Sequence, residues 1–285
     1  MTIGEWRNKL RERLRPVSGE LSAYEADRLL GEVVGADPTE LTLRYRDLVP
    51  ADAAQRLENL VADRLRGRPL AYVIGHLEFC GLDLLCDERA LIPRPETEEL
   101  VSIALQCLPP PEVSAHPLAI DVGTGSGNIA LALAHRRPDL HLIAADISAE
   151  ALTLAGENRA RLGLVGSVSL VRGDSLTMLA SGCADVVVSN PPYVIPGDPK
   201  LDQSVSAYEP AAALYGGSTG VEVIRDLLDQ GPSVLHSGGV LVCEIGYDQG
   251  PTVRALVGRD PRWGPPVLHR DLAGIERVLV AQRRS

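Results

Sequence analysis

The segment DVVVSNPPYV, residues 185–194, runs from β-branched residues into an asparagine, two prolines and a tyrosine. The side-chain oxygen of Asn190 and the backbone carbonyl of Pro191 can each accept one N–H of a planar NH₂ group. Proline fixes its own φ and keeps the residue before it extended, so Pro191 and Pro192 make the corner rigid. Tyr193 adds a ring face for stacking. We interpret this corner as a clamp for a substrate amine, although Asn-Pro-Pro could also serve only to end a strand.

Such a clamp suits group transfer to an amide nitrogen, which is a poor nucleophile because its lone pair is conjugated with the carbonyl group. Two hydrogen bonds from the NH₂ group would aim the lone pair at an electrophilic carbon and favour positive charge on nitrogen. Near-attack positioning can supply up to roughly 7–11 kcal/mol of barrier reduction, so a general base is not required. Water can take the proton after transfer.

A glycine-rich loop, DVGTGSGN, precedes an apolar helical pattern. It contains Gly123, Thr124, Gly125, Ser126 and Gly127, and glycines at this place let backbone N–H groups approach a ligand closely. The spacing is G-x-G-x-G rather than the G-x-G-x-x-G of dinucleotide sites, and no Gly-Lys-Ser/Thr follows as in a phosphate-binding loop. A turn that only packs a helix on a sheet would look similar.

Polar residues end the next two predicted strands. Asp146 follows the second strand, where such folds place the carboxylate that accepts ribose hydroxyls, and Asp174 and Ser175 follow the third. Ligands of open α/β sheets bind outside the carboxyl ends of the strands, so these residues would share one crevice with Asn190. A nucleoside without a pyrophosphate fits this arrangement, and S-adenosyl-L-methionine is the obvious candidate.

The elements that must position these residues alternate between strand and helix after residue 117. This alternation predicts an α/β fold with a largely parallel sheet and helices on both faces. We expect three parts: a helical domain at 1–75, a β-hairpin linker at 76–92 and an α/β domain at 93–285. Within the first, Ser22 and Glu25 have capping-box spacing. In the third, the segment RPETEELVSIALQCL, residues 94–108, should form a helix opened by Pro95.

Composition sets limits on partners and location. The chain has 285 residues and a formal net charge of -10, which disfavours broad nucleic-acid binding. Five cysteines without a C-x-x-C pair or histidines at ligand spacing indicate free thiols, and no metal site is expected. Neither a signal peptide nor a membrane-spanning apolar run is evident, so we expect a cytoplasmic protein without a membrane partner.

Several motifs together resemble one family. The segments RPLAYVIGHLEF, LIPRPETEELV, DVGTGSGNIALALA, AADISAEAL, VSNPPYV, YEPAAALYGG, LVCEIGYDQG and RDLAGIERV are similar to those of the peptide chain release factor glutamine methyltransferases of the HemK/PrmC type. Asn-Pro-Pro-Tyr alone is shared with methyltransferases that act on base amines. IPRPETE, YEP and EIGYDQG are more specific to the glutamine-modifying branch.

The resemblance implies a class I S-adenosylmethionine-dependent methyltransferase domain, with a seven-stranded, Rossmann-like sheet and an N-terminal helical domain that helps recognise the substrate. The implied reaction methylates the glutamine of the Gly-Gly-Gln motif in class 1 release factors, tunes translation termination and yields S-adenosyl-L-homocysteine. It assigns donor binding to residues 123–127 together with Asp146, Ser175 and Asn190, catalysis to Asn190 and Pro191, and substrate binding to residues 190–193.

Some residues and functions stay open. Arg94, Glu96 and Thr97 could line the cavity or only start a helix, Glu209 could shape the substrate entrance or be a loop carboxylate, and Phe79 fits the core. One rival function is N-methylation of a ribosomal protein glutamine or of an exocyclic amine in nucleic acid. A second is a non-catalytic S-adenosylmethionine-binding protein, for which the clamp would be unnecessary.

Overall fold

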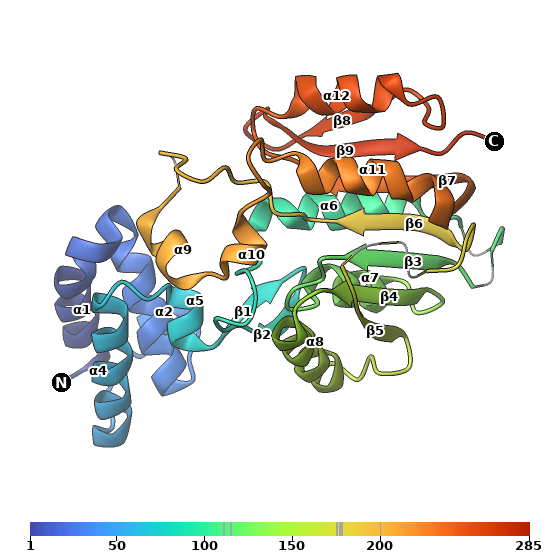
Figure 1. Ribbon diagram of the computed structural model, residues 1–285. Coiled ribbons are helices and arrows are strands. Elements are labelled where there is room, and N and C mark those ends of the chain that lie inside the picture. The colour runs from blue at the N-terminus through green and yellow to red at the C-terminus, as the bar shows by residue number, and fades with distance from the viewer. Residues whose placement is uncertain (111, 115, 175, 177–178, 200) are drawn as a thin grey trace. The chain divides into compact units, whose positions relative to one another are not determined.

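A computed structural model describes residues 1–110, 112–114, 116–174, 176, 179–199 and 201–285 (Figure 1). The chain divides into two compact units, Met1–Leu77 and Glu78–Ser285. The first is helical, and the second is built on a sheet. The helices of the first unit are α1 Ile3–Ser18, α2 Ser22–Val34, α3 Pro38–Leu43, α4 Ala51–Leu65 and α5 Leu70–Ile74, with a 3₁₀ turn at Gly19–Leu21.

Apolar stripes at helical spacing build the core of the N-terminal unit. Leu10 and Leu14 lie one turn apart on α1 and are fully buried, as are Leu57 and Val61 on α4. Side chains four residues apart share one face of a helix, so each stripe turns toward the others and leaves polar side chains outside. They form one cluster with Leu29, Leu30 and Leu41.

The predicted capping box at Ser22 is wrong. The 3₁₀ turn runs directly into α2, so Ser22 already has helical φ and ψ, its N–H donates to Gly19, and no side chain caps the helix. Capping boxes occur instead at the starts of α1 and α3, where Thr2 pairs with Glu5 and Asp37 with Glu40.

Glu25, the other half of the expected box, has a long-range partner. The guanidinium of Arg64 on α4 donates to both of its carboxylate oxygens, at 2.8 and 3.1 Å, and the Ser18 hydroxyl donates to the same group. Both Glu25 and Arg64 are buried. A bidentate, buried ion pair therefore joins α2 to α4.

The second unit holds most of the secondary structure. The strands β1 His76–Phe79 and β2 Leu82–Leu85 form the expected hairpin at the division between the units, and Phe79 is buried as predicted. The helix expected to open at Pro95 does so. The helices are α6 Pro95–Cys107, α7 Asn128–Arg136, α8 Ala149–Arg161, α9 Gln203–Tyr208, α10 Ala211–Leu214, α11 Glu222–Val234 and α12 Gly250–Arg259.

The main sheet has seven strands in the order β5-β4-β3-β6-β7-β9-β8. The first five are parallel, and β9 and β8 are antiparallel to their neighbours. This confirms the predicted fold class, although the sequence pattern did not reveal β8. Strand bounds are β3 Leu118–Val122, β4 His141–Asp146, β5 Val168–Arg172, β6 Ala184–Ser189, β7 Leu235–Glu244, β8 Val267–Arg270 and β9 Glu276–Gln282.

Apolar rows across the sheet fix its position between two layers of helices. Ile120, Val187, Leu241 and Ala281 are register partners on successive strands, and all pack in one cluster with α11 and α12. Neighbouring residues on each strand point to the other face, where α6 contacts β6, β7 and β9. Burial on both faces explains the continuous apolar runs of the parallel strands.

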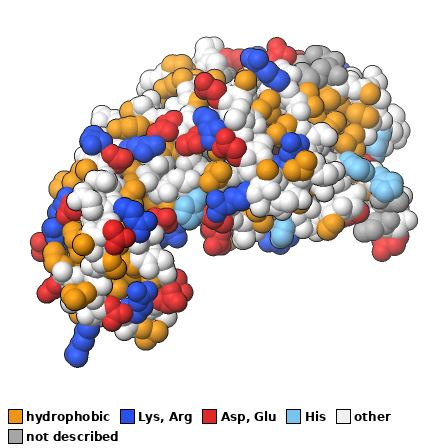
Figure 2. Space-filling model, turned by 90° about the horizontal axis from the view of Figure 1, so that it is seen from below, with side chains coloured by type: hydrophobic (Ala, Val, Ile, Leu, Met, Phe, Trp, Pro, Cys, Tyr) orange, Lys and Arg blue, Asp and Glu red, His pale blue; other side chains and the backbone are white. Residues whose placement is uncertain are grey.

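Figure 2 shows acidic and basic side chains interspersed over the face that it displays.

All five cysteines are free thiols, as expected. Among the described residues, no helix combines the length and the apolar character needed to cross a membrane.

Candidate active site

A cavity of about 540 Å³ opens at the carboxyl ends of the parallel strands. This volume lies within the range of small-molecule sites. The strand order changes direction between β3 and β6, and ligands of open α/β sheets bind at such a switch point. The lining comes from segments 88–94, 122–126, 128–129, 146–148, 150–151, 173–174, 189–192 and 210–213, with Thr97 and Val223. Gly127, the last glycine of the predicted loop, is not part of the lining.

The glycine loop follows β3 and leads into α7. The N–H groups of Gly123 and Thr124 both donate to the carbonyl of Ala145 on β4, at 2.9 and 3.0 Å, which fixes the loop against the next strand. Gly127 has φ +84° and caps α7; a Cβ there would lie 3.1 Å from Leu131 and 3.2 Å from Ala155. A side chain at 127 would thus be strained in conformation, and the Leu131 and Ala155 side chains would have to shift by a few tenths of an ångström to admit its Cβ.

Asp146, at the end of β4, is held rigidly at the cavity wall. One of its carboxylate oxygens accepts the N–H of Gly125 at 2.8 Å, and the other accepts the N–H of Ser148 at 2.9 Å. A carboxylate oxygen can accept more than one hydrogen bond. Asp146 therefore keeps acceptor capacity for a ligand in the cavity.

Asp121 lies beneath the glycine loop, and sequence reasoning did not identify it as a site residue. It is fully buried in β3, and one oxygen accepts the Thr124 hydroxyl at 2.6 Å and the N–H of Ala130 at 3.2 Å. Burial raises the pKa of Asp121 to about 7, and these hydrogen bonds oppose the shift. A charged residue inside an apolar strand was the available signal.

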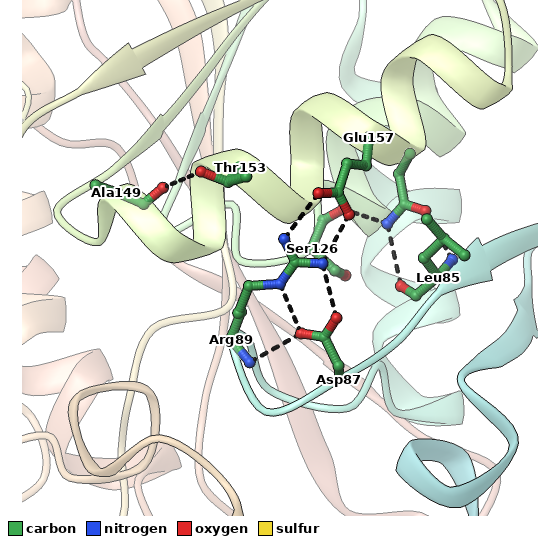
Figure 3. A network of polar contacts seen from close by, with 8 residues as sticks. Leu85, Asp87, Arg89, Ser126, Ala149, Thr153 and Glu157 are labelled. Carbon is green, nitrogen blue, oxygen red and sulfur yellow. Dashed lines mark hydrogen bonds and ion pairs between the residues drawn. The ribbon is translucent and has the colours of Figure 1, made fainter.

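The segment between the hairpin and α6 forms one wall of the cavity and is anchored to α8. Figure 3 shows Arg89 between Asp87 and Glu157, with hydrogen bonds of 2.7–2.9 Å to both carboxylates. The buried amide of Asn158 donates to the carbonyls of Leu85 and Ser126 and accepts the N–H of Leu85. These contacts join the hairpin, the glycine loop and α8 around the cavity.

Asn190 lies directly after β6, half-buried at the cavity wall. The Ser189 hydroxyl donates to the carbonyl of Val122 at 2.7 Å, which fixes the ends of β6 and β3 together. Beyond the corner, Val194 donates to the carbonyl of Leu214 at 2.9 Å. The last residue of α10 thus supports the Asn-Pro-Pro-Tyr corner from outside.

The remaining sequence predictions have mixed outcomes. Arg94, Thr97 and Asp174 line the cavity, whereas Glu96 is exposed and does not. Glu209 is buried; it accepts the Arg94 guanidinium at 2.6 Å and the N–H of Ile92 at 3.1 Å, and so anchors the wall segment. Ser175 lies outside the described residues. No cluster of three or more metal-ligating side chains occurs in the part of the chain that the structure describes.

The comparisons with known proteins agree on the class. Residues 102–206 match the family profile described as methyltransferase small domain, and residues 5–75 match the PrmC N-terminal domain. A methyltransferase of Pyrococcus furiosus has a TM-score of 0.51 at 18% identity, over 72% of this chain and 90% of that one. The hMettl16 catalytic domain has a TM-score of 0.53 at 15% identity, over 82% of each chain. The fold is that of the class I methyltransferases.

Closer relatives give the family. A release factor glutamine methyltransferase of Moorella thermoacetica is 38% identical over 100% of both chains. The enzyme of the same name from Neisseria gonorrhoeae is 37% identical over 99% of this chain and 98% of its own. The chain belongs to the release factor glutamine methyltransferase family.

Proposed function

We propose that this protein transfers a methyl group from S-adenosyl-L-methionine to the side-chain nitrogen of the glutamine in the Gly-Gly-Gln motif of class 1 release factors. The observation that carries the proposal is the place of Asn190. It lies at the switch point of the sheet and lines the same cavity as the glycine loop and Asp146. A hydrogen-bond acceptor for an amine thus shares one cavity with a candidate nucleoside site.

The cavity suits the donor. Asp146 offers fixed carboxylate oxygens for the ribose hydroxyls, and the backbone of residues 123–126 lines the cavity and permits the close approach of a ligand. Ile147 lines the cavity with 59% of its surface exposed and offers an apolar face to a purine. In this proposal the donor is bound by residues 123–127, Asp146 and Asn190, and it supplies an electrophilic methyl group on a sulfonium. The family resemblance implies Ser175 as a further residue at the adenine edge.

The corner at residues 190–193 would bind the substrate amide. Asn190 Oδ1 and the Pro191 carbonyl each accept one N–H, so the nitrogen lone pair is directed at the methyl carbon, while Pro192 and Tyr193 complete the clamp. As the new N–C bond forms, the C–S bond breaks and its electron pair stays on sulfur. The nitrogen becomes cationic, and both acceptors stabilise that charge before the proton leaves to water. S-adenosyl-L-homocysteine is the other product.

The substrate is assigned from the relatives and from the N-terminal unit. Full-length similarity to enzymes named for release factor glutamine methylation supports a class 1 release factor as partner. The match of residues 5–75 to the PrmC N-terminal domain supports a substrate-recognition role for the predicted helical domain at 1–75. Since release factors act in translation termination, we infer that the reaction takes place in the cytoplasm, without a membrane partner and without direct nucleic-acid binding.

Label transfer tests the proposal. The purified chain is incubated with methyl-labelled donor and one of four acceptors: a class 1 release factor, the same factor with its Gly-Gly-Gln glutamine replaced by alanine, ribosomal proteins, or total RNA. We expect label only in the unaltered factor. Label in ribosomal protein or RNA would support the rival substrates, and donor binding without transfer to any acceptor would support a binding protein.

A further inference from the structure

A buried carboxylate lies beside the Asn190 corner and is not among the residues that bind the donor or the substrate in the proposed reaction. Glu244 ends β7 with 2% of its surface exposed. Ser189 on β6 pairs with Cys243 on β7, and Asn190 and Glu244 are the residues that follow this pair on the two neighbouring strands. The chain thus puts a carboxylate next to the clamp, at a depth where an unpaired charge would be costly.

Both oxygens of Glu244 have hydrogen-bond donors from the clamp region. The Thr97 hydroxyl donates to Oε2 at 2.8 Å, and the Tyr193 phenol donates to Oε1 at 3.3 Å. Thr97 is itself buried, at 1% exposure, on the first turn of α6. Three segments distant in the sequence therefore meet at one carboxylate.

The direction of these bonds decides the orientation of Asn190. An ionised carboxylate can only accept, so the single proton of Thr97 is committed to Glu244. The Thr97 oxygen then has only lone pairs to offer Asn190, and Asn190 Nδ2 donates to it at 3.1 Å. No described residue donates a hydrogen bond to Asn190 Oδ1, which is left as the acceptor of the amide.

Orientation matters because the two ends of an asparagine amide are nearly equal in size but opposite in hydrogen bonding. If the amide were rotated by a half-turn, Asn190 would present N–H groups to the NH₂ of the substrate. Two donors would then face each other, and the substrate nitrogen would lose the acceptor that aims it. A half-buried asparagine without a fixed partner could take either orientation.

We propose that Thr97 and Glu244 are positioning residues that hold the Asn190 amide with its oxygen toward the substrate nitrogen. Glu244 sets the direction of the Thr97 hydroxyl, and Thr97 sets the orientation of Asn190. Tyr193 shares the same carboxylate, so its ring is fixed by the group that orients the amide. This inference rests on the proposed function, since it assigns Asn190 the acceptor role.

The kinetic test compares Thr97→Val, which removes the hydroxyl at nearly constant volume, with Thr97→Ser, which retains it. We expect Thr97→Val to lower kcat by about 10- to 100-fold with little change in the KM for the donor, and Thr97→Ser to recover most of the rate. Thr153→Val is the matched control, because the Thr153 hydroxyl bonds only to the backbone of α8, at Ala149 (Figure 3). This control should keep the kcat of the parent.

A double-mutant cycle separates positioning from a general structural defect. If Thr97 acts through Asn190, Thr97→Val in an Asn190→Ala background should change kcat by no more than about twofold. A structural role would lower the rate by the same factor in both backgrounds. Equal effects in the two backgrounds would overturn the inference.

A spectroscopic test does not depend on turnover. The side-chain amide resonances of Asn190, assigned by their loss in Asn190→Ala with ¹⁵N-asparagine labelling, should move in Thr97→Val and in Glu244→Gln but stay near the parent positions in Thr97→Ser. Unchanged Asn190 resonances in Thr97→Val would overturn the inference, whether or not the wild-type chain methylates a release factor. Failure of the wild-type chain to methylate any release factor would refute the proposed function instead.

Discussion

Gly127 gives a prediction whose size can be worked out from the structure. Gly127→Ala places a residue with a Cβ at φ +84°, which costs about 1–2 kcal/mol. The new carbon would also meet Leu131 at 3.1 Å and Ala155 at 3.2 Å, and crowding of this kind costs about 1–3 kcal/mol. We therefore expect the free energy of unfolding to fall by about 2–5 kcal/mol.

Gly163→Ala is the matched control. Gly163 follows the C-cap of α8 with φ +71°, and its added Cβ would have no heavy atom within 4 Å, so only the conformational cost of about 1–2 kcal/mol applies. Urea unfolding measures both variants, and calorimetric titration measures donor affinity. We expect Gly127→Ala to raise the donor Kd about tenfold or more, which corresponds to a loss of about 1.4 kcal/mol of binding free energy. We expect no change in the donor Kd for Gly163→Ala. Equal stability losses and an unchanged Kd would refute this account of the loop.

Three further predictions follow from buried or cavity-lining carboxylates. Asp146→Asn should raise the donor Kd by about 10-fold or more in the same titration, because a charged acceptor is lost. Glu25→Ala should lower the free energy of unfolding by about 3–5 kcal/mol, since Arg64 stays buried without its partner. Burial raises the pKa of Glu244, and the nearby charge of Glu96 adds to the rise. Hydrogen bonds from Thr97 and Tyr193 and the charge of Arg277 oppose this shift. Because the ionised form of Glu244 orients the Thr97 hydroxyl, kcat should fall as pH is lowered through that raised pKa, and Glu244→Gln should lack this acid limb in a pH–rate profile.

The elements around the cavity were largely predictable from the sequence. Strand and helix alternate after residue 117, and parallel strands bring all their carboxyl ends to one edge. This is why the sequence alone assigns the glycine loop, Asp146 and Asn190 to one crevice. Each is a short, local signal at the end of an apolar run.

What could not be predicted depends on partners far apart in the sequence. Thr97 and Asn190 are 93 residues apart, and Thr97 and Glu244 are 147 apart, so no local pattern reveals their contacts. The Ser22 capping box was wrong because the preceding 3₁₀ turn already makes Ser22 helical, and Glu25 pairs instead with Arg64, 39 residues away. Long-range pairing overrides local propensity where a buried charge must find its counter-ion.

The most direct test of the central claim is the position of the methyl group. After incubation of the wild-type chain with the donor and a class 1 release factor, peptide fragmentation by mass spectrometry locates the added methyl. We predict a single methyl on the side-chain nitrogen of the Gly-Gly-Gln glutamine, and a much smaller yield when Asn190→Ala replaces the wild type. A methyl on any other residue of the factor, or an equal yield from Asn190→Ala, would contradict the account.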